Sequence, residues 1–240
     1  MRLMRTGGSF LISLLVFGCG AAMPTETPAP TSGPTPTPSG PHDMSLPAEG
    51  ASLMPGTYSV RTGGVTPAKF TITEAGWVAL SGDLASWEIG LDESHTIVVA
   101  HEAKALDPLG DGYGSQVAIG PTAADFANWL ASLDVLTTTA PTSVTLGGIA
   151  GVTLDVGLQW PGNRPIHTFC DPADPCAALF ATTLTSADGL GIVASERDRF
   201  FVLDGPGGVV VVDVGARKED WDSFMPAAQA VLDSLQFETD

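Results

Sequence analysis

Val209-Val210-Val211-Val212-Asp213-Val214 is a run of six residues with a single polar side chain. A strand that exposes one face alternates apolar and polar residues, whereas a strand buried on both faces reads as a continuous apolar run. The four consecutive valines therefore predict a strand in the middle of a sheet, covered on both faces. The rest of the chain must supply its neighbours and whatever covers them.

Alternating segments elsewhere in the chain predict the neighbouring strands. Short runs of alternating apolar and polar residues, separated by turns rich in Gly and Asp, indicate antiparallel strands. In segment 86–91, for example, Trp87, Ile89 and Leu91 are predicted to share one buried face. The predicted strands are 57–62, 69–73, 77–81, 86–91, 96–101, 143–146, 151–160, 179–184, 190–195, 199–204 and 209–214. The first five read as a meander.

Two further segments have the period of amphipathic helices. Thr122 followed by Asp125 fits a capping box, and the next apolar residues form one stripe: Phe126, Trp129, Leu130 and Leu133. Near the C-terminus the residues at helical spacing are Trp221, Phe224, Met225, Ala228, Leu232 and Leu235. Pro226 would break an interior turn, so we predict that Ser223 caps this helix, which puts Pro226 in the first turn.

Together these elements predict an α+β fold, an antiparallel sheet flanked by two main helices, over a single domain at residues 45–240. Several short phrases resemble bacterial lipoprotein domains of the PsbP-like fold. They are Leu53-Met54-Pro55-Gly56-Thr57-Tyr58, Gly76-Trp77, Gly147-Gly148-Ile149-Ala150-Gly151 and the closing run at 228–237. The resemblance covers most of residues 50–237 and implies a central antiparallel sheet with helices on both sides. It transfers no catalytic residue, because these motifs concern packing.

The first 18 residues have the layout of an export signal. Arg2 and Arg5 precede an apolar run, 10–17, that is too short to span a bilayer. Val16-Phe17-Gly18-Cys19 resembles the lipobox of bacterial lipoproteins, although Phe17 is larger than is usual there. The resemblance implies that Cys19 is acylated, with palmitate among the chains, and becomes the mature N-terminus. It would anchor the protein at the extracytoplasmic face of the cell membrane, periplasmic or at the cell surface. Ordinary cleavage at Gly20-Ala21-Ala22 is the alternative.

Residues 19–44 are predicted to form a disordered linker rich in Pro and Thr. Segment 24–41 has seven prolines and no large apolar residue, and would reach about 55 Å if it is polyproline-like. The formal net charge of −17 becomes −19 when Arg2 and Arg5 are removed (−17 − 2). Such a charge disfavours nucleic acid as a partner. The expected partners are the membrane, through the lipid anchor, and a protein, glycan or small-molecule ligand.

Cys170 and Cys176 remain once Cys19 is assigned to the lipid. In an exported chain two such cysteines usually pair, and the short loop gives the bond about 2 kcal/mol. A redox or metal role is the alternative, but the spacing fits neither a thioredoxin-like motif nor a second Cys or His pair.

No Gly-x-Ser-x-Gly, Walker or EF-hand motif is present. Segment 189–194 matches the dinucleotide fingerprint in its letters, but Ile192-Val193 indicates a strand where that motif requires a helix. The sequence therefore assigns no catalytic residue, metal or cofactor. The strongest candidate is a binding edge made of two irregular stretches, one within 105–120 and one leading from Trp160 to the cysteine loop. Its candidate residues are Asp107, Asp111, Tyr113, Trp160, Arg164 and His167. The alternative is that Trp160 closes the core and Arg164 is solvated. The acid pairs Asp107/Asp111 and Asp171/Asp174 fit either Ca²⁺ ligands or ordinary turns.

Three functions remain open at this point. The first is a membrane-anchored, non-enzymatic module that binds a ligand or partner protein. The second is a hydrolase or metal-dependent enzyme, which requires His101, His167 and nearby acids to converge. The third is a structural subunit of an envelope assembly, as some PsbP-like domains are.

Overall fold

The computed structural model describes residues 44–61, 66–82, 85–108, 115–160, 170–171, 173–182 and 189–238, all within one compact unit. The predicted signal segment, Cys19 and the predicted linker up to residue 43 lie outside the described residues. Met44, predicted as the last linker residue, already takes part in a short strand.

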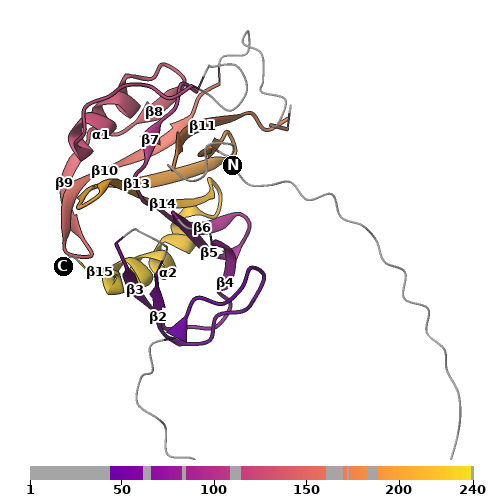
Figure 1. Ribbon diagram of the computed structural model, residues 1–240. Helices are drawn as coiled ribbons and strands as arrows, with labels where there is room; N and C mark the ends of the chain where they lie inside the picture. The colour runs from indigo at the N-terminus through magenta and orange to yellow at the C-terminus, as the bar shows by residue number, and fades with distance from the viewer. Residues whose placement is uncertain are drawn as a thin grey trace, which may run out of the picture. The chain divides into compact units, whose positions relative to one another are not determined.

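An eight-stranded antiparallel sheet forms the centre of this unit (Figure 1). Its path runs β4 (Val78–Gly82), β5 (Ser86–Asp92), β6 (His95–Ala100), β14 (Gly208–Arg217), β13 (Glu196–Gly205), β10 (Ile149–Leu158) and β8 (Leu136–Thr138), and β9 (Thr142–Leu146) also pairs with β10. The valine strand β14 has three strands of this path on either side. Its predicted central position is confirmed.

Two smaller sheets complete the strands. One has the order β1 (Met44–Ser45), β2 (Gly56–Val60), β3 (Ala68–Ile72) and β15 (Gln236–Phe237), and the other has the order β12 (Leu190–Val193), β11 (Cys176–Ala181) and β7 (Lys104–Ala105). Each predicted strand is present with its ends shifted by at most three residues. The predicted meander holds for β4, β5 and β6, whereas β2 and β3 form a separate hairpin. Strands β1, β7 and β8 have only two or three residues, too few to show a period.

Two helices flank the central sheet, as predicted. α1 (Ala123–Ser132) and α2 (Trp221–Ser234) lie on opposite sides of β13 and β14 (Figure 1). The capping box of α1 is confirmed, because Thr122 Oγ1 accepts the N–H of Asp125 while the Asp125 carboxylate accepts the N–H of Thr122. The α+β fold class, an antiparallel sheet flanked by two helices, is therefore confirmed.

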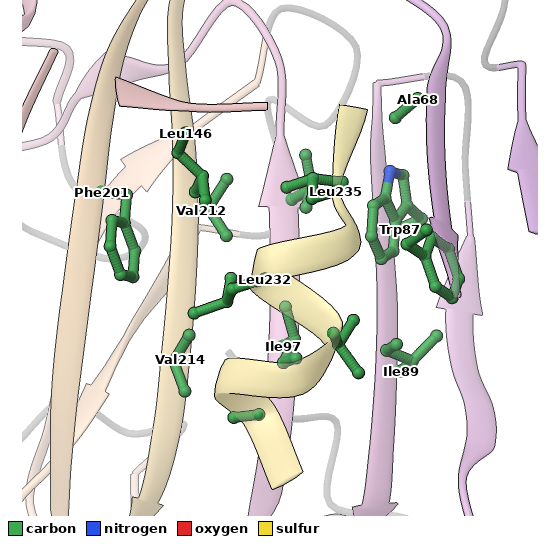
Figure 2. Close-up of a cluster of buried hydrophobic side chains, with 14 of the residues drawn as sticks. Ala68, Trp87, Ile89, Ile97, Leu146, Phe201, Val212, Val214, Leu232 and Leu235 are labelled. Carbon is green, nitrogen blue, oxygen red and sulfur yellow. The ribbon is translucent and has the colours of Figure 1, made fainter. Parts of the chain in front are cut away.

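The two helices cover two separate hydrophobic cores. The α2-face core joins α2 to the β2–β3 hairpin and to one face of the central sheet. Figure 2 shows Leu232 of α2, and Leu235 directly after the helix, beside Val212 and Ile97 of the sheet. The α1-face core joins α1 and β11 to the other face. In β14, Val210, Val212 and Val214 belong to the α2-face core, whereas Val209 and Val211 belong to the α1-face core. The unbroken valine run thus reflects burial on both faces.

The prediction for Leu91 is wrong. Trp87 and Ile89 are buried in the α2-face core as expected, but Leu91 is 39% exposed. The pairing of β5 with β6 shifts register between Gly90 and Asp92. Such an irregularity reverses the inward and outward alternation, so the residue next in the pattern turns to solvent.

The predicted start of the second helix is also wrong. α2 begins at Trp221, and the N–H groups of Ser223 and Phe224 both donate to the carbonyl of Asp220. Pro226 is therefore the sixth helical residue and cannot donate to the carbonyl of Asp222. Both of these residues are exposed, so water can reach that carbonyl. Burial of Trp221 in the α2-face core fixes the helix start, overriding the local signal.

Candidate functional site

The structure describes only part of the predicted binding edge. Asp111, Tyr113, Arg164 and His167 lie outside the described residues, so their predicted roles stay predictions. Asp107 is half-buried, and its N–H donates to the carbonyl of Ser115 at 2.8 Å. The neighbouring Leu106 pairs with Gln116 and donates its N–H to Leu179 of β11 at 2.9 Å. The ends of the predicted irregular segment are thus tied into strand-like pairing.

Trp160, at the start of the second predicted stretch, is half-buried and packs against the α1-face core. The preceding Gln159 donates its N–H to the carbonyl of Val135 at 2.8 Å, which holds this end of β10 against the segment after α1. This position agrees with the alternative weighed above, in which Trp160 helps to close the core.

The Cys170–Cys176 disulfide is present, with Cα atoms 5.4 Å apart. Asp171 Oδ1 accepts the N–H of Ala173 at 2.8 Å, a local turn bond. The carboxylate of Asp174 accepts both the N–H and the hydroxyl of Ser195, at 2.8 and 2.6 Å. The acid pair thus stabilises turns, and the cross-linked loop is pinned to the turn between β12 and β13.

His101 lies in a packed interior. Its side chain is 2% exposed, and its ring meets Phe237 edge-on with centroids 6.1 Å apart. Burial lowers the pKa of His101 to about 4, although the charge of Glu102 opposes the shift. The imidazole is therefore neutral at pH 7 and almost completely shielded from solvent. His167, its predicted partner in a metal or hydrolase site, lies outside the described residues.

Strand β13 sorts its charges between the two faces of the sheet. Glu196 and Asp198 point to the face that carries the α1-face core and are buried, as is Asp213, which pairs with Phe200 of that core. All three residues take part in polar or electrostatic interactions. Sequence reasoning missed this row because the predicted strand began at Arg199. The alternation Glu196-Arg197-Asp198-Arg199 was the signal that could have revealed it.

The two arginines of this alternation point to the opposite face and form what we call the arginine cluster: Arg197, Arg199, Asp155 and Trp221. Arg199 donates from Nε and Nη2 to the two carboxylate oxygens of Asp155, at 2.6 and 3.2 Å. Arg197 Nη2 donates to Asp155 Oδ2 at 2.6 Å. Burial raises the pKa of Asp155, but the hydrogen bonds and charges of both arginines outweigh it and hold the pKa below its usual value.

Trp221 supports the two guanidinium groups from the helix side. The guanidinium carbon of Arg197 lies 4.7 Å from the centroid of the Trp221 ring, and that of Arg199 lies 5.8 Å away. These distances are within cation–π range. The cluster could not be predicted from local patterns, because more than 40 residues separate Asp155 from the arginines and the pairing of β10 with β13 brings them together.

Two general features of the described residues bear on the kind of site present. Among them, no group of three His, Cys, Asp or Glu side chains is placed to hold a metal ion. No helix in this part of the chain is long and apolar enough to cross a membrane.

Fold and site define an α+β protein with one helix on each face of an antiparallel sheet, a disulfide-closed loop and an arginine cluster. Comparison with known families and with curated proteins gives no match to the sequence. Among solved structures, the cyanobacterial PsbP protein CyanoP of Synechocystis sp. PCC 6803 is similar with a TM-score of 0.36 and 12% identity, over 80% of this chain and 99% of that one. LpqN, involved in cell envelope biogenesis of Mycobacterium tuberculosis, is similar with a TM-score of 0.38 and 12% identity, over 78% of this chain and 93% of that one. Likeness at this level identifies neither a family nor a function.

Proposed function

We propose that this protein is a lipoprotein, held at the extracytoplasmic face of the cell membrane by acyl chains on Cys19, and that its α+β unit is a non-enzymatic binding or accessory module. The observation that carries the proposal is the Cys170–Cys176 disulfide. Disulfides persist in oxidising compartments and are rare in the cytosol. This supports export, which the arginines, apolar run and lipobox-like Cys19 of the N-terminus also favour.

The disulfide-closed loop is the part of this module that we propose for contact with a protein, glycan or small-molecule ligand. The loop is cross-linked at its base and bonded through Asp174 to Ser195. A loop held in one conformation loses little further entropy when it binds. The predicted stretch from Trp160 through Arg164 and His167 leads into it.

Nothing in the described geometry favours the enzymatic alternative over this proposal. Its central residue, His101, is neutral at pH 7 and enclosed beside Phe237. The third possibility, a subunit of an envelope assembly, shares the anchor and differs only in having one permanent partner.

Replacement of the anchoring cysteine tests the first half of the proposal. We expect Cys19→Ser to be exported but released from the membrane, whereas the double variant Cys170→Ser/Cys176→Ser, which removes cysteines elsewhere, should stay in the membrane fraction. Mass spectrometry should find an acylated Cys19 at the mature N-terminus. Membrane retention of Cys19→Ser, or an unmodified terminus beyond residue 19, would refute the anchor.

A variant that loosens the disulfide-closed loop tests whether this loop contacts the partner. Asp174→Ala removes both bonds to Ser195, and we expect it to weaken crosslinking of the full-length chain to its partner in native membranes. Asp233→Ala, an exposed acid on α2, is the matched control. Equal crosslinking by both variants would exclude the loop, and one stoichiometric partner that survives detergent extraction would favour the assembly subunit.

A further inference from the structure

The arginine cluster has more positive charge than it can neutralise. Arg197 and Arg199 share the single carboxylate of Asp155, which leaves a charge of about +1 on the chain's surface. Their side chains are 42% and 33% exposed. The whole chain has a formal net charge of −17. The acidic chain as a whole repels anions, but a small anion is attracted at short range to a fixed cationic spot such as this one.

Most N–H donors of Arg197 and Arg199 are not used by the hydrogen bonds within the described part of the chain. A guanidinium has five N–H donors in a planar fork. Within the described part of the chain, Arg197 donates one side-chain hydrogen bond and Arg199 donates two, all to Asp155. Arg197 can therefore offer a second pair of parallel N–H groups to an incoming oxyanion, the geometry in which arginine binds carboxylates.

Trp221 keeps the arginines in place for this task. It is buried in the α2-face core and lies under both guanidinium groups, at 4.7 and 5.8 Å. Asp155 fixes them from the side. Free arginine side chains lose rotamer entropy when they bind, and a side chain that is already stacked and hydrogen-bonded has less to lose.

Strand β10 places no side chain directly opposite Arg197, because the partner of Arg197 in the β10–β13 pairing is Gly157. A Cβ at this position would lie 2.9 Å from Thr137 Oγ1, so a hydroxyl borders the same place. Thr137 now donates to the carbonyl of Gly157 at 3.2 Å, a long bond that a stronger acceptor can replace.

We propose that the arginine cluster binds the carboxylate of a ligand, with Arg197 as the main contact, Arg199 as its charged neighbour and Thr137 as a hydroxyl donor. One negative charge balances the +1 of the cluster. A phosphate dianion would leave excess negative charge beside Asp155, so a monoanionic carboxylate is the better match. This site is separate from the disulfide loop and does not depend on the lipid anchor.

The test is an NMR titration of the purified full-length chain that observes arginine Nε–H signals, since the sequence has only seven arginines. N-acetylglycine is the probe, its uncharged amide is the control, and inorganic phosphate is a second arm. We expect N-acetylglycine to shift the Arg197 and Arg199 signals with saturation and to leave Arg61 and Arg217 unchanged. Shifts that are equal with the amide, unsaturable or common to all arginines would overturn the proposal. Tighter binding of phosphate would overturn the carboxylate assignment.

Variants separate binding from a merely structural ion pair. Arg197→Lys keeps the charge but removes the planar set of N–H donors, so it should weaken the binding of N-acetylglycine at least five-fold. Arg217→Lys is the matched control. Asp155→Asn removes the competing carboxylate and should strengthen the probe at least three-fold, provided that circular dichroism shows a folded chain. Unchanged affinity in Arg197→Lys, or weaker binding in folded Asp155→Asn, would refute the site.

Discussion

The two faces of the central sheet are built differently. The α2-face core is filled by large side chains, with Phe70 stacked between Tyr58 and Trp87 at centroid distances of 5.6 and 4.9 Å. The α1-face core has its own aromatic chain but uses many alanines, and further along the strands it gives way to buried carboxylates. Aromatic burial stabilises a fold, whereas buried carboxylates contribute little net stability. We therefore expect the aromatic packing on the α2 face to contribute more to the free energy of unfolding than the buried carboxylates on the α1 face.

Removing the central ring of the aromatic stack should have the strongest effect on the free energy of unfolding. Phe70→Ala should lower the free energy of unfolding by about 4 kcal/mol, because it removes a fully buried ring and leaves a cavity. Urea denaturation at pH 7 measures the change. Leu91→Ala, at the position where the register shift exposes the side chain, is the control and should change stability by less than about 0.5 kcal/mol. Similar losses for both would contradict this view of the α2 face.

Acidification should weaken the fold at His101, on the α2 side. Its pKa is about 4 in the folded chain and 6.5 without perturbation, so the folded state disfavours the charged imidazole. Stability from this residue is full above pH 6.5 and is lost as the pH falls towards 4, by about 3 kcal/mol.

The difference between wild type and His101→Leu isolates this contribution, since the carboxylates titrate in both proteins. Urea titrations at several pH values should show the wild type losing about 3 kcal/mol more than His101→Leu between pH 7 and pH 4. Parallel pH profiles would show that the pKa of His101 is the same in the folded and unfolded chain, and would contradict the prediction.

Changes at the starts of the two helices should have the weakest effects on the free energy of unfolding. Thr122→Ala removes the cap of α1 and should destabilise the chain by about 1 kcal/mol. Asp220→Ala, at the corresponding position of α2, should cost about 0.5 kcal/mol or less, because Asp220 makes no side-chain capping bond and buried Trp221 fixes that helix. Hydrogen bonds to Thr122 lower the pKa of Asp125. This pKa, measured by NMR, should therefore be higher in Thr122→Ala than in the wild type. Equal destabilisation by the two changes would contradict the distinction.

Local patterns predicted most of the fold. Four consecutive valines predicted that β14 is buried on both faces, and Thr122 with Asp125 predicted the cap of α1. Both predictions succeeded because each signal lies within a few neighbouring residues. The disulfide between Cys170 and Cys176 was predicted because these are the two cysteines that remain in an exported chain once Cys19 is assigned to the lipid, and the structure contains it. The predicted binding residues were less accessible to this reasoning, and the structure describes only Asp107 and Trp160 among them.

Most of the strands and both helices follow from local sequence patterns, since hydrophobic period and capping act between near neighbours. The start of α2 depends on tertiary packing, because burial of Trp221 outweighs the break expected at Pro226. The exposure of Leu91 also depends on tertiary structure, because the pairing of β5 with β6 shifts register at this residue. Tertiary structure also brought Asp155 to Arg197 and Arg199, because contacts across paired strands depend on register rather than on distance along the chain.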